Sequence, residues 1–272
     1  MAINSYDVAL SYGMEKRTST SKTHKYGTVG HLPDGRAFRY SFADGAVDAG
    51  VVMQAAAQPH SGELDMDLPI SSALNAIGDR QISVDLTTGL STIMVPDEFA
   101  DGLLYINNGP GEGHVYRISS HSSLSSDHTT AFLVALAFDD VIQSTGLSTL
   151  SLLGLIKNQY KDVVAIDNPT VTFTNVVGAT PTAVGDNENF WLQTWGAAAL
   201  KITAKLLVPI LGSAVQPNIT TSDLAGSVTG YDTVNSTDTA AEPLGGTPII
   251  GYSMAVAAVD ADFGLVFLQI AP

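Results

Sequence analysis

Three histidines recur at seven-residue intervals in the middle of the chain, at His114, His121 and His128. Imidazole nitrogens are common zinc and copper ligands, but they must all lie within about 2.1 Å of one metal ion. The local pattern places His114 on a strand and the other two in a serine-rich loop, so no shared face relates them. We therefore expect no metal site and no bound cofactor.

Paired carboxylates are the second group with possible chemistry, since glycoside hydrolysis and calcium binding both use them. The pairs are Asp65 with Asp67, Asp139 with Asp140, and Asp260 with Asp262. No D-x-[DN]-x-[DN]-G loop accompanies them, and an acidic chain produces such pairs by chance. Weak calcium binding stays an open alternative, and glycosidase chemistry is not expected.

Signatures of nucleophilic catalysis and phosphate binding are absent from the sequence. It contains no cysteine and no G-x-S-x-G motif. The glycine-rich segment 109–113 lacks the lysine and the following helix that a phosphate-binding loop requires, so it predicts a tight hairpin loop. We expect a protein that is not an enzyme and has no catalytic residues.

Basic and aromatic residues near the N-terminus suggest docking instead. Residues 1–39 carry six basic and three acidic residues, whereas the rest of the chain carries six basic and 24 acidic residues. Basic and aromatic side chains together favour an interface. The predicted docking residues are Lys16, Arg17, Lys22, Lys25, Arg36, Phe38, Arg39 and Tyr40.

Trp191 and Trp195 form a second aromatic feature, within NFWLQTWGAAAL. In a strand these two positions share a face with Gln193, which would suit an aromatic platform for sugar. Large rings of this kind more often belong to a core or a subunit interface. We therefore treat both as possible interface aromatics.

The candidate residues lie on short segments in which apolar and polar residues alternate, and turn residues separate these segments. Phe38, Tyr40 and Phe42 alternate between two Asp-Gly turns, and similar short runs continue to FGLVFLQIAP at the end. This predicts an all-β or mainly β fold, with two small barrel or sandwich subdomains, an extended N-terminal arm and at most short helices, STLSLLGLIKNQ being one candidate.

The expected domain boundaries follow the changes in composition. They give an arm over residues 1–45, a first β subdomain over 46–120 and a larger second one over 121–272, divided at the serine-rich segment that begins at residue 119. We expect the arm to be partly ordered by a partner, so that deletion of residues 1–30 leaves the body folded.

Composition excludes several partners. A net charge of −15 disfavours nucleic acid, which requires clustered basic residues. The longest apolar run, residues 131–138, is far shorter than the roughly 20 residues of a membrane helix, and the first residues lack the pattern of a secretory signal. We expect neither nucleic acid nor membrane as a partner.

The chain resembles the capsid decoration, or cement, proteins of tailed double-stranded DNA phages. The resemblance lies in the basic arm, GRAFRYSFADGAVDAGVVMQA (35–55), GPGEGHVYRISSH (109–121), NFWLQTWGAAAL and FGLVFLQIAP. It implies a β-rich protein, made in the host cytoplasm, that forms a homotrimer on the outer capsid surface of the virion. Its partner would be the major capsid protein, and the arm would reach over that protein or a neighbouring subunit.

Two other functions remain open at this point. The chain would be another virion component if it were a tail or major capsid protein, although no segment offers the long helix usual in the latter. Trp191, Trp195, the tyrosines and the Ser/Thr-rich surface would instead suit a carbohydrate-binding or adhesive module.

Overall fold

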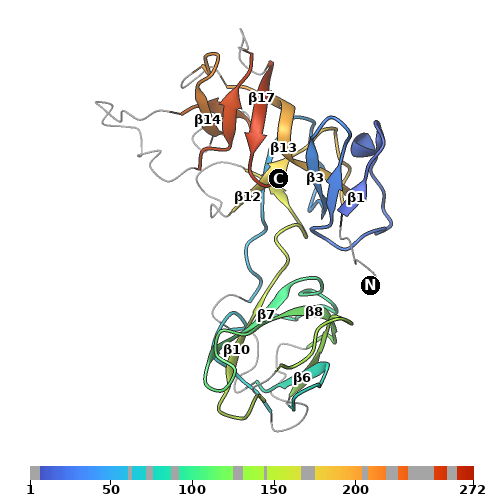
Figure 1. Ribbon diagram of the computed structural model, residues 1–272, viewed down its shortest axis with the longest axis vertical. Helices are drawn as coiled ribbons and strands as arrows, with labels where there is room; N and C mark the ends of the chain where they lie inside the picture. The colour runs from blue at the N-terminus through green and yellow to red at the C-terminus, as the bar shows by residue number, and fades with distance from the viewer. Residues whose placement is uncertain are drawn as a thin grey trace, which may run out of the picture. The chain divides into compact units, whose positions relative to one another are not determined.

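The computed structural model falls into two compact units. One unit combines Met1–Ala57 with Gln159–Pro272, and the other comprises Gln58–Asn158. We call them the large-sheet unit and the barrel unit (Figure 1). The described residues are 7–60, 63–71, 76–86, 92–124, 131–143, 146–166, 175–203, 208–218, 226–231, 248–255 and 262–272.

The large-sheet unit contains one 11-stranded sheet and a single turn of 3-10 helix, η1 (Met14–Lys16). Its strands are β1 (Asp7–Ala9), β2 (Val29–His31), β3 (Ala37–Phe42), β4 (Val52–Gln54), β11 (Val164–Ala165), β12 (Val176–Ala179), β13 (Asn189–Lys201), β14 (Ala214–Pro217), β15 (Val228–Gly230), β16 (Gly251–Ser253) and β17 (Phe263–Gln269). The main path runs β1-β2-β3-β13-β17-β16-β14-β15, and β12, β4 and β11 branch from β13.

Strand β13 organises this sheet because its two halves have different neighbours. Its first half pairs with β3, and its second half pairs with β17. Residues 189–194 are buried on both faces, whereas residues 195–201 alternate between more exposed and more buried positions. A register shift after Gln193 and a positive φ of 88° at Gly196 mark the change, as at a β-bulge.

The N-terminal residues are part of this sheet, which corrects the expected arm over residues 1–45. Strand β3 pairs along the first half of β13, β2 pairs with β3, and β1 runs parallel to β2. Leu10 and Leu32 are buried in one cluster with Phe38 and Tyr40. Widely spaced apolar side chains of this segment pack against β3. Deletion of residues 1–30 would therefore expose buried side chains of the core, contrary to the expectation that the body stays folded without them.

The barrel unit is a six-stranded sheet. Its strands are β5 (Leu68–Pro69), β6 (Gln81–Val84), β7 (Leu103–Asn108), β8 (Val115–His121), β9 (Phe132–Leu136) and β10 (Leu152–Ile156). The order is β5-β10-β7-β8-β9-β6, and a bridge between Ile70 and Val84 links the two ends. The Ser71 N–H donates to Ser83 O at 2.8 Å across this junction, so the sheet is nearly closed.

The interior of the barrel unit is filled by side chains. Its cluster of buried residues includes Phe99, Tyr116 and Ile118, and it shares no member with the clusters of the large-sheet unit. Segment 109–113 is the loop of the β7-β8 hairpin, as expected. A Cβ at Gly109 would lie 2.2 Å from Leu150 O, which explains the glycine there.

The domain boundary expected near residue 120 is also wrong. The serine-rich segment connects β8 with β9, which are neighbouring strands of one sheet, so it lies within a unit. The chain leaves the large-sheet unit after Ala57 and returns at Gln159, and neither boundary has a strong change in composition.

The fold class itself is confirmed, because strands account for the regular structure and the described residues include only η1 as a helix. The helix considered at STLSLLGLIKNQ is instead strand β10, whose continuous apolar run fits a buried strand. Over the described segments, no helix has the length and apolar character needed to cross a membrane.

Candidate docking surface

The basic residues between positions 16 and 25 form an exposed strip on the large-sheet unit, which we call the cationic ridge. Its members are Lys16, Arg17, Lys22 and Lys25. All four side chains are exposed. The segment from residue 17 to residue 25 contains no strand. The ridge thus consists of four of the eight residues predicted for docking.

Two sets of hydrogen bonds hold this segment in place. Ser19 and Asn189 exchange backbone hydrogen bonds of 2.9 and 2.7 Å at the start of β13. Further along, the N–H of Thr23 donates to the Tyr40 hydroxyl oxygen at 3.0 Å. The ridge therefore rests on strands β3 and β13 rather than moving as a free tail.

Aromatic packing beneath the ridge adds a third attachment. The His24 ring lies 5.1 Å from the Tyr40 ring and 5.3 Å from the Trp191 ring. Tyr40 and Trp191 are cross-strand partners whose rings meet edge to face at 5.2 Å. Close packing also limits Gly30, where a Cβ would lie 2.7 Å from both Leu10 and Trp191.

The four ridge residues differ in their contacts with the described residues. No ion pair to a described residue is present at Lys16, Arg17 or Lys25. Lys22 instead places its ammonium 4.0 Å from the centre of the Tyr26 ring. In a chain of net charge −15, these four exposed basic residues lie within ten positions of one another.

Arg36 and Arg39 have different surroundings from the ridge. Arg36 forms an ion pair with Asp34 at 2.8 Å. Arg39 donates to Gly27 O at 3.2 Å and lies 6.0 Å from the centre of the Tyr160 ring. Both side chains are only partly exposed, so they hold local structure together and offer less to a partner than the ridge does.

Phe38 and Tyr40 belong to the core, which corrects their expected place on a docking surface. Phe38 is fully buried and Tyr40 is 3% exposed. Both lie in the cluster that contains Trp191 and Leu10. Their alternation on a strand was recognised correctly, but the N-terminal segment covers the face that they share.

The two tryptophans also separate. Trp191 is 5% exposed and lies opposite Tyr40, whereas Trp195 is partly exposed and lies opposite Ala37. The register shift between them interrupts the alternation that would have placed both on one face. Trp191 is therefore a core residue, and only Trp195 is available to a partner.

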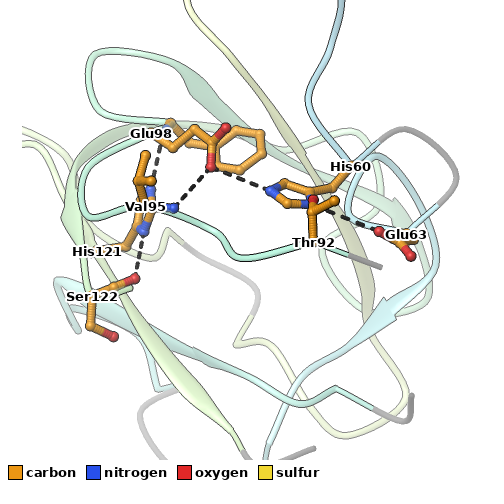
Figure 2. Close-up of polar contacts among 8 residues, drawn as sticks. His60, Glu63, Thr92, Val95, Glu98, His121 and Ser122 are labelled. Atoms are coloured by element: carbon orange, nitrogen blue, oxygen red, sulfur yellow. Dashed lines mark hydrogen bonds and ion pairs between the residues drawn. The ribbon is translucent and has the colours of Figure 1, made fainter. Parts of the chain in front are cut away.

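A polar cluster that the sequence did not indicate lies in the barrel unit (Figure 2). His60 Nε2 lies 3.3 Å from Glu98 Oε2, and its Nδ1 lies 3.2 Å from Thr92 Oγ1. A neutral imidazole satisfies both contacts by donating to the carboxylate and accepting from the hydroxyl. The three residues lie up to 38 positions apart, so no local motif signals them.

This hydroxyl, imidazole and carboxylate arrangement has the group order of a catalytic triad. The His60 side chain is only 3% exposed, and neither the groove beside Ser122 and Leu133 nor the groove beside Tyr160 and Ile250 is lined by His60 or Thr92. Glu98 also accepts the Val95 N–H at 3.2 Å. The contacts fit a clamp between two turns of the chain, and we assign the cluster that role.

The histidines considered for metal binding make separate contacts. His114 Nδ1 lies 3.1 Å from the Tyr116 hydroxyl oxygen. His121 Nε2 accepts the Phe99 N–H at 3.0 Å, so Nδ1 carries the proton and donates to Ser122 O. His128 lies outside the described residues. In the part of the chain that the structure describes, no three His, Asp or Glu residues could hold a metal ion.

Three carboxylates from two of the predicted pairs accept structural hydrogen bonds. Asp67 accepts from the Asn107 side-chain amide at 2.6 Å. Asp139 pairs with the Arg117 guanidinium, and Asp140 accepts the Arg117 backbone N–H. Asp260 lies outside the described residues, so the third pair is not described as a pair.

Comparison with known proteins identifies no relative: no protein-family model, curated protein or solved structure matches the chain.

The Glu188 carboxyl contacts Thr18 beside the ridge, and its pKa can be measured. Hydrogen bonds from the Thr18 side chain and the Gly185 N–H lower the pKa of the Glu188 carboxyl below its usual 4.5. Because the folded-state pKa is depressed, this stabilisation is present above pH 4.5 and is lost as the pH falls through the lowered value. Carboxyl-carbon NMR should place the Glu188 midpoint below 4.5. A midpoint at or above 4.5 would contradict the two contacts, and Glu188→Gln identifies the resonance by removing it.

Proposed function

We propose that this protein is a virion structural protein that binds the outer surface of a tailed-phage capsid and stabilises it by bridging capsomers. In this proposal the cationic ridge docks on acidic surface of the major capsid protein, and the acidic body faces outward. The observation that carries the proposal is the exposed, anchored set of Lys16, Arg17 and Lys25 on a chain of net charge −15.

Attachment on a repeated surface explains why a small ridge is sufficient. Each exposed ion pair contributes only about 0.2–1 kcal/mol. An oligomer, which we expect to be a homotrimer, presents several ridges at once, and a capsid repeats their partner by symmetry. Simultaneous contacts then give an avidity far above the affinity of one ridge.

A carbohydrate-binding module is the second candidate, because the Trp195 and Tyr252 side chains are both partly exposed on the large-sheet unit. Aromatic rings can stack on apolar sugar faces. Binding of oligosaccharides by the purified protein, with loss of binding in Trp195→Ala, would favour this candidate over capsid binding.

The test uses phage heads assembled without this protein. Lys16→Glu, Arg17→Glu and Lys25→Glu together should weaken binding about 10- to 100-fold, since each change removes an attraction and adds a repulsion. Binding of the unaltered protein should also weaken as salt rises from about 50 to 500 mM. Cosedimentation and electron microscopy measure both effects.

A matched control reverses three basic residues outside the ridge, Arg80→Glu, Lys157→Glu and Lys161→Glu, so that the net charge changes by the same amount. This variant should bind heads nearly as well as the unaltered protein, and circular dichroism verifies that all variants fold. Equal loss in ridge and control variants would show that net charge alone governs binding. Full binding by the ridge variant would reject the docking surface.

A further inference from the structure

The second half of β13 and the strands beyond it expose an apolar sheet face. Phe263 is 50% exposed, Leu265 is 38% exposed and Tyr252 is 37% exposed. Phe267 stacks on Tyr252 at 5.2 Å with an interplanar angle of 9°, and Trp195 meets Phe267 edge to face at 5.6 Å. We call these five residues the aromatic face.

Strand register shows that the aromatic face is continuous. Phe267 lies opposite Ala197 on β13 and opposite Tyr252 on β16, and Tyr252 lies opposite Ala214 on β14. The Tyr231 N–H donates to Ala214 O at 2.9 Å, which extends the row to the end of β15. The row therefore crosses five strands without a charged side chain.

The other side of these strands is ordinary core. Val266 and Leu268 alternate with the exposed residues of β17 and are fully buried with Leu200 and Val215. A sheet with one face in the core usually presents polar side chains on its other face. Here the outward positions are aromatic and aliphatic, so core packing does not account for them.

Among the described residues, Lys201 and Asp48 mark a charged end of the aromatic face. Lys201 lies opposite Phe263 and forms an ion pair with Asp48 at 2.7 Å. Its ammonium holds the pKa of the Asp48 carboxyl below the usual value through that hydrogen bond. The interior rows contain Trp195 with Gln269, Ala197 with Phe267, and Ala199 with Leu265. An uncharged centre and a charged rim are typical of protein interfaces.

The size of the aromatic face suits a protein partner. Five strands about 4.8 Å apart, and seven residues about 3.3 Å apart along β17, give a footprint of about 400 Å². The largest apolar patch of a monomer is usually about 300–600 Å² and is often functional. This is about half of the roughly 800 Å² that each partner contributes to a standard interface, so the face can form the apolar centre of such a contact.

We propose that the aromatic face is the surface through which two copies of this chain associate. A chain of net charge −15 has acidic surface elsewhere, and a cationic partner would bind there. The aromatic face has no acidic residue at its centre, so it does not suit a cationic partner. A second copy carries the same uncharged rows, so both bury apolar area without placing like charges together. The proposed function expects an oligomer, and the inference rests on it only in that respect. It adds the surface through which the copies make contact.

The test measures the mass of the full-length protein by sedimentation velocity over a concentration series, without phage heads. The unaltered protein should be a dimer or a trimer at micromolar concentration. Leu265→Lys should raise the dissociation constant at least about 100-fold, because it buries an unpaired charge at the centre of the contact. The matched control is Leu103→Lys on β7, a leucine that is 42% exposed in the barrel unit, and it should leave the mass unchanged.

A monomeric unaltered protein would overturn this inference, and so would an oligomer that Leu265→Lys leaves intact. Quenching of Trp195 fluorescence by oligosaccharides in a monomer would also overturn it and assign the face to glycans. These failures are distinguishable from failure of capsid docking, because the ridge is intact in Leu265→Lys and its binding to heads is measured separately. Circular dichroism verifies the fold of both leucine variants.

Discussion

Trp191→Ala is expected to lower the free energy of unfolding of the large-sheet unit by about 3–5 kcal/mol. The ring is 5% exposed and packs against Tyr40, His24 and the backbone at Gly30. Neither strand can move in to fill the space, because β3 and β13 are fixed by their pairing. The cost therefore combines lost burial with a cavity.

Hydrogen exchange followed by mass spectrometry measures this effect segment by segment. Peptides that cover β3 and the first half of β13 should lose protection in Trp191→Ala. Trp191→Phe is the matched control, since it keeps a ring opposite Tyr40 and should cost much less. Unchanged protection of β3 in the alanine variant would show that the ring does not support this part of the sheet.

The same substitution links stability with the proposed docking. His24 rests on the Trp191 and Tyr40 rings and lies between Lys22 and Lys25 of the ridge. Loss of the Trp191 ring should therefore loosen the ridge as well as the sheet. A positive surface that is held in one position loses less conformational entropy on binding than a free tail does.

Local patterns in the sequence were sufficient to predict many of the strands. Alternation of Phe38 and Tyr40 predicted β3, and the closing run FGLVFLQIAP predicted β17. Such patterns report which residues face a common side. They do not report what covers that side, so Phe38 and Tyr40 were expected at a surface although Leu10 and Leu32 cover them.

The arrangement of strands could not be predicted in the same way. Strand β3 pairs with β13 about 150 residues later in the chain, and the barrel unit is inserted between them. No composition change marks such an insertion, because the chain leaves and re-enters one sheet through short connections. The expected boundary at the serine-rich segment followed a loop signal that connects β8 with β9 within one unit.

The candidate surfaces were predictable to different degrees. Charge imbalance alone identified Lys16, Arg17, Lys22 and Lys25, because exposed lysines depend little on what surrounds them. The aromatic face could be recognised only from the pairing of β13 with β17 and of β17 with β16. This pairing brings Trp195 and Tyr252 against the Phe267 ring. Residues this far apart carry no local signal of their proximity.

Phe99→Ala is the corresponding prediction for the barrel unit, with an expected loss of about 3–5 kcal/mol in the free energy of unfolding. Phe99 is fully buried and its ring lies 5.7 Å from the His121 ring. Its backbone N–H, which His121 Nε2 accepts, is unchanged by the substitution. The expected loss therefore measures packing and leaves that hydrogen bond in place.

The two units have separate clusters of buried side chains. We therefore expect Phe99→Ala to reduce hydrogen-exchange protection at different amides from those affected by Trp191→Ala. Peptides from β7 and β8 should lose protection in Phe99→Ala, while those from β13 serve as the internal reference. Phe99→Leu should cost only about 1 kcal/mol, since it retains most of the buried volume. Equal loss of protection in β13 and β8 would mean that the two cores unfold as one cooperative unit, against their division into separate clusters of buried side chains.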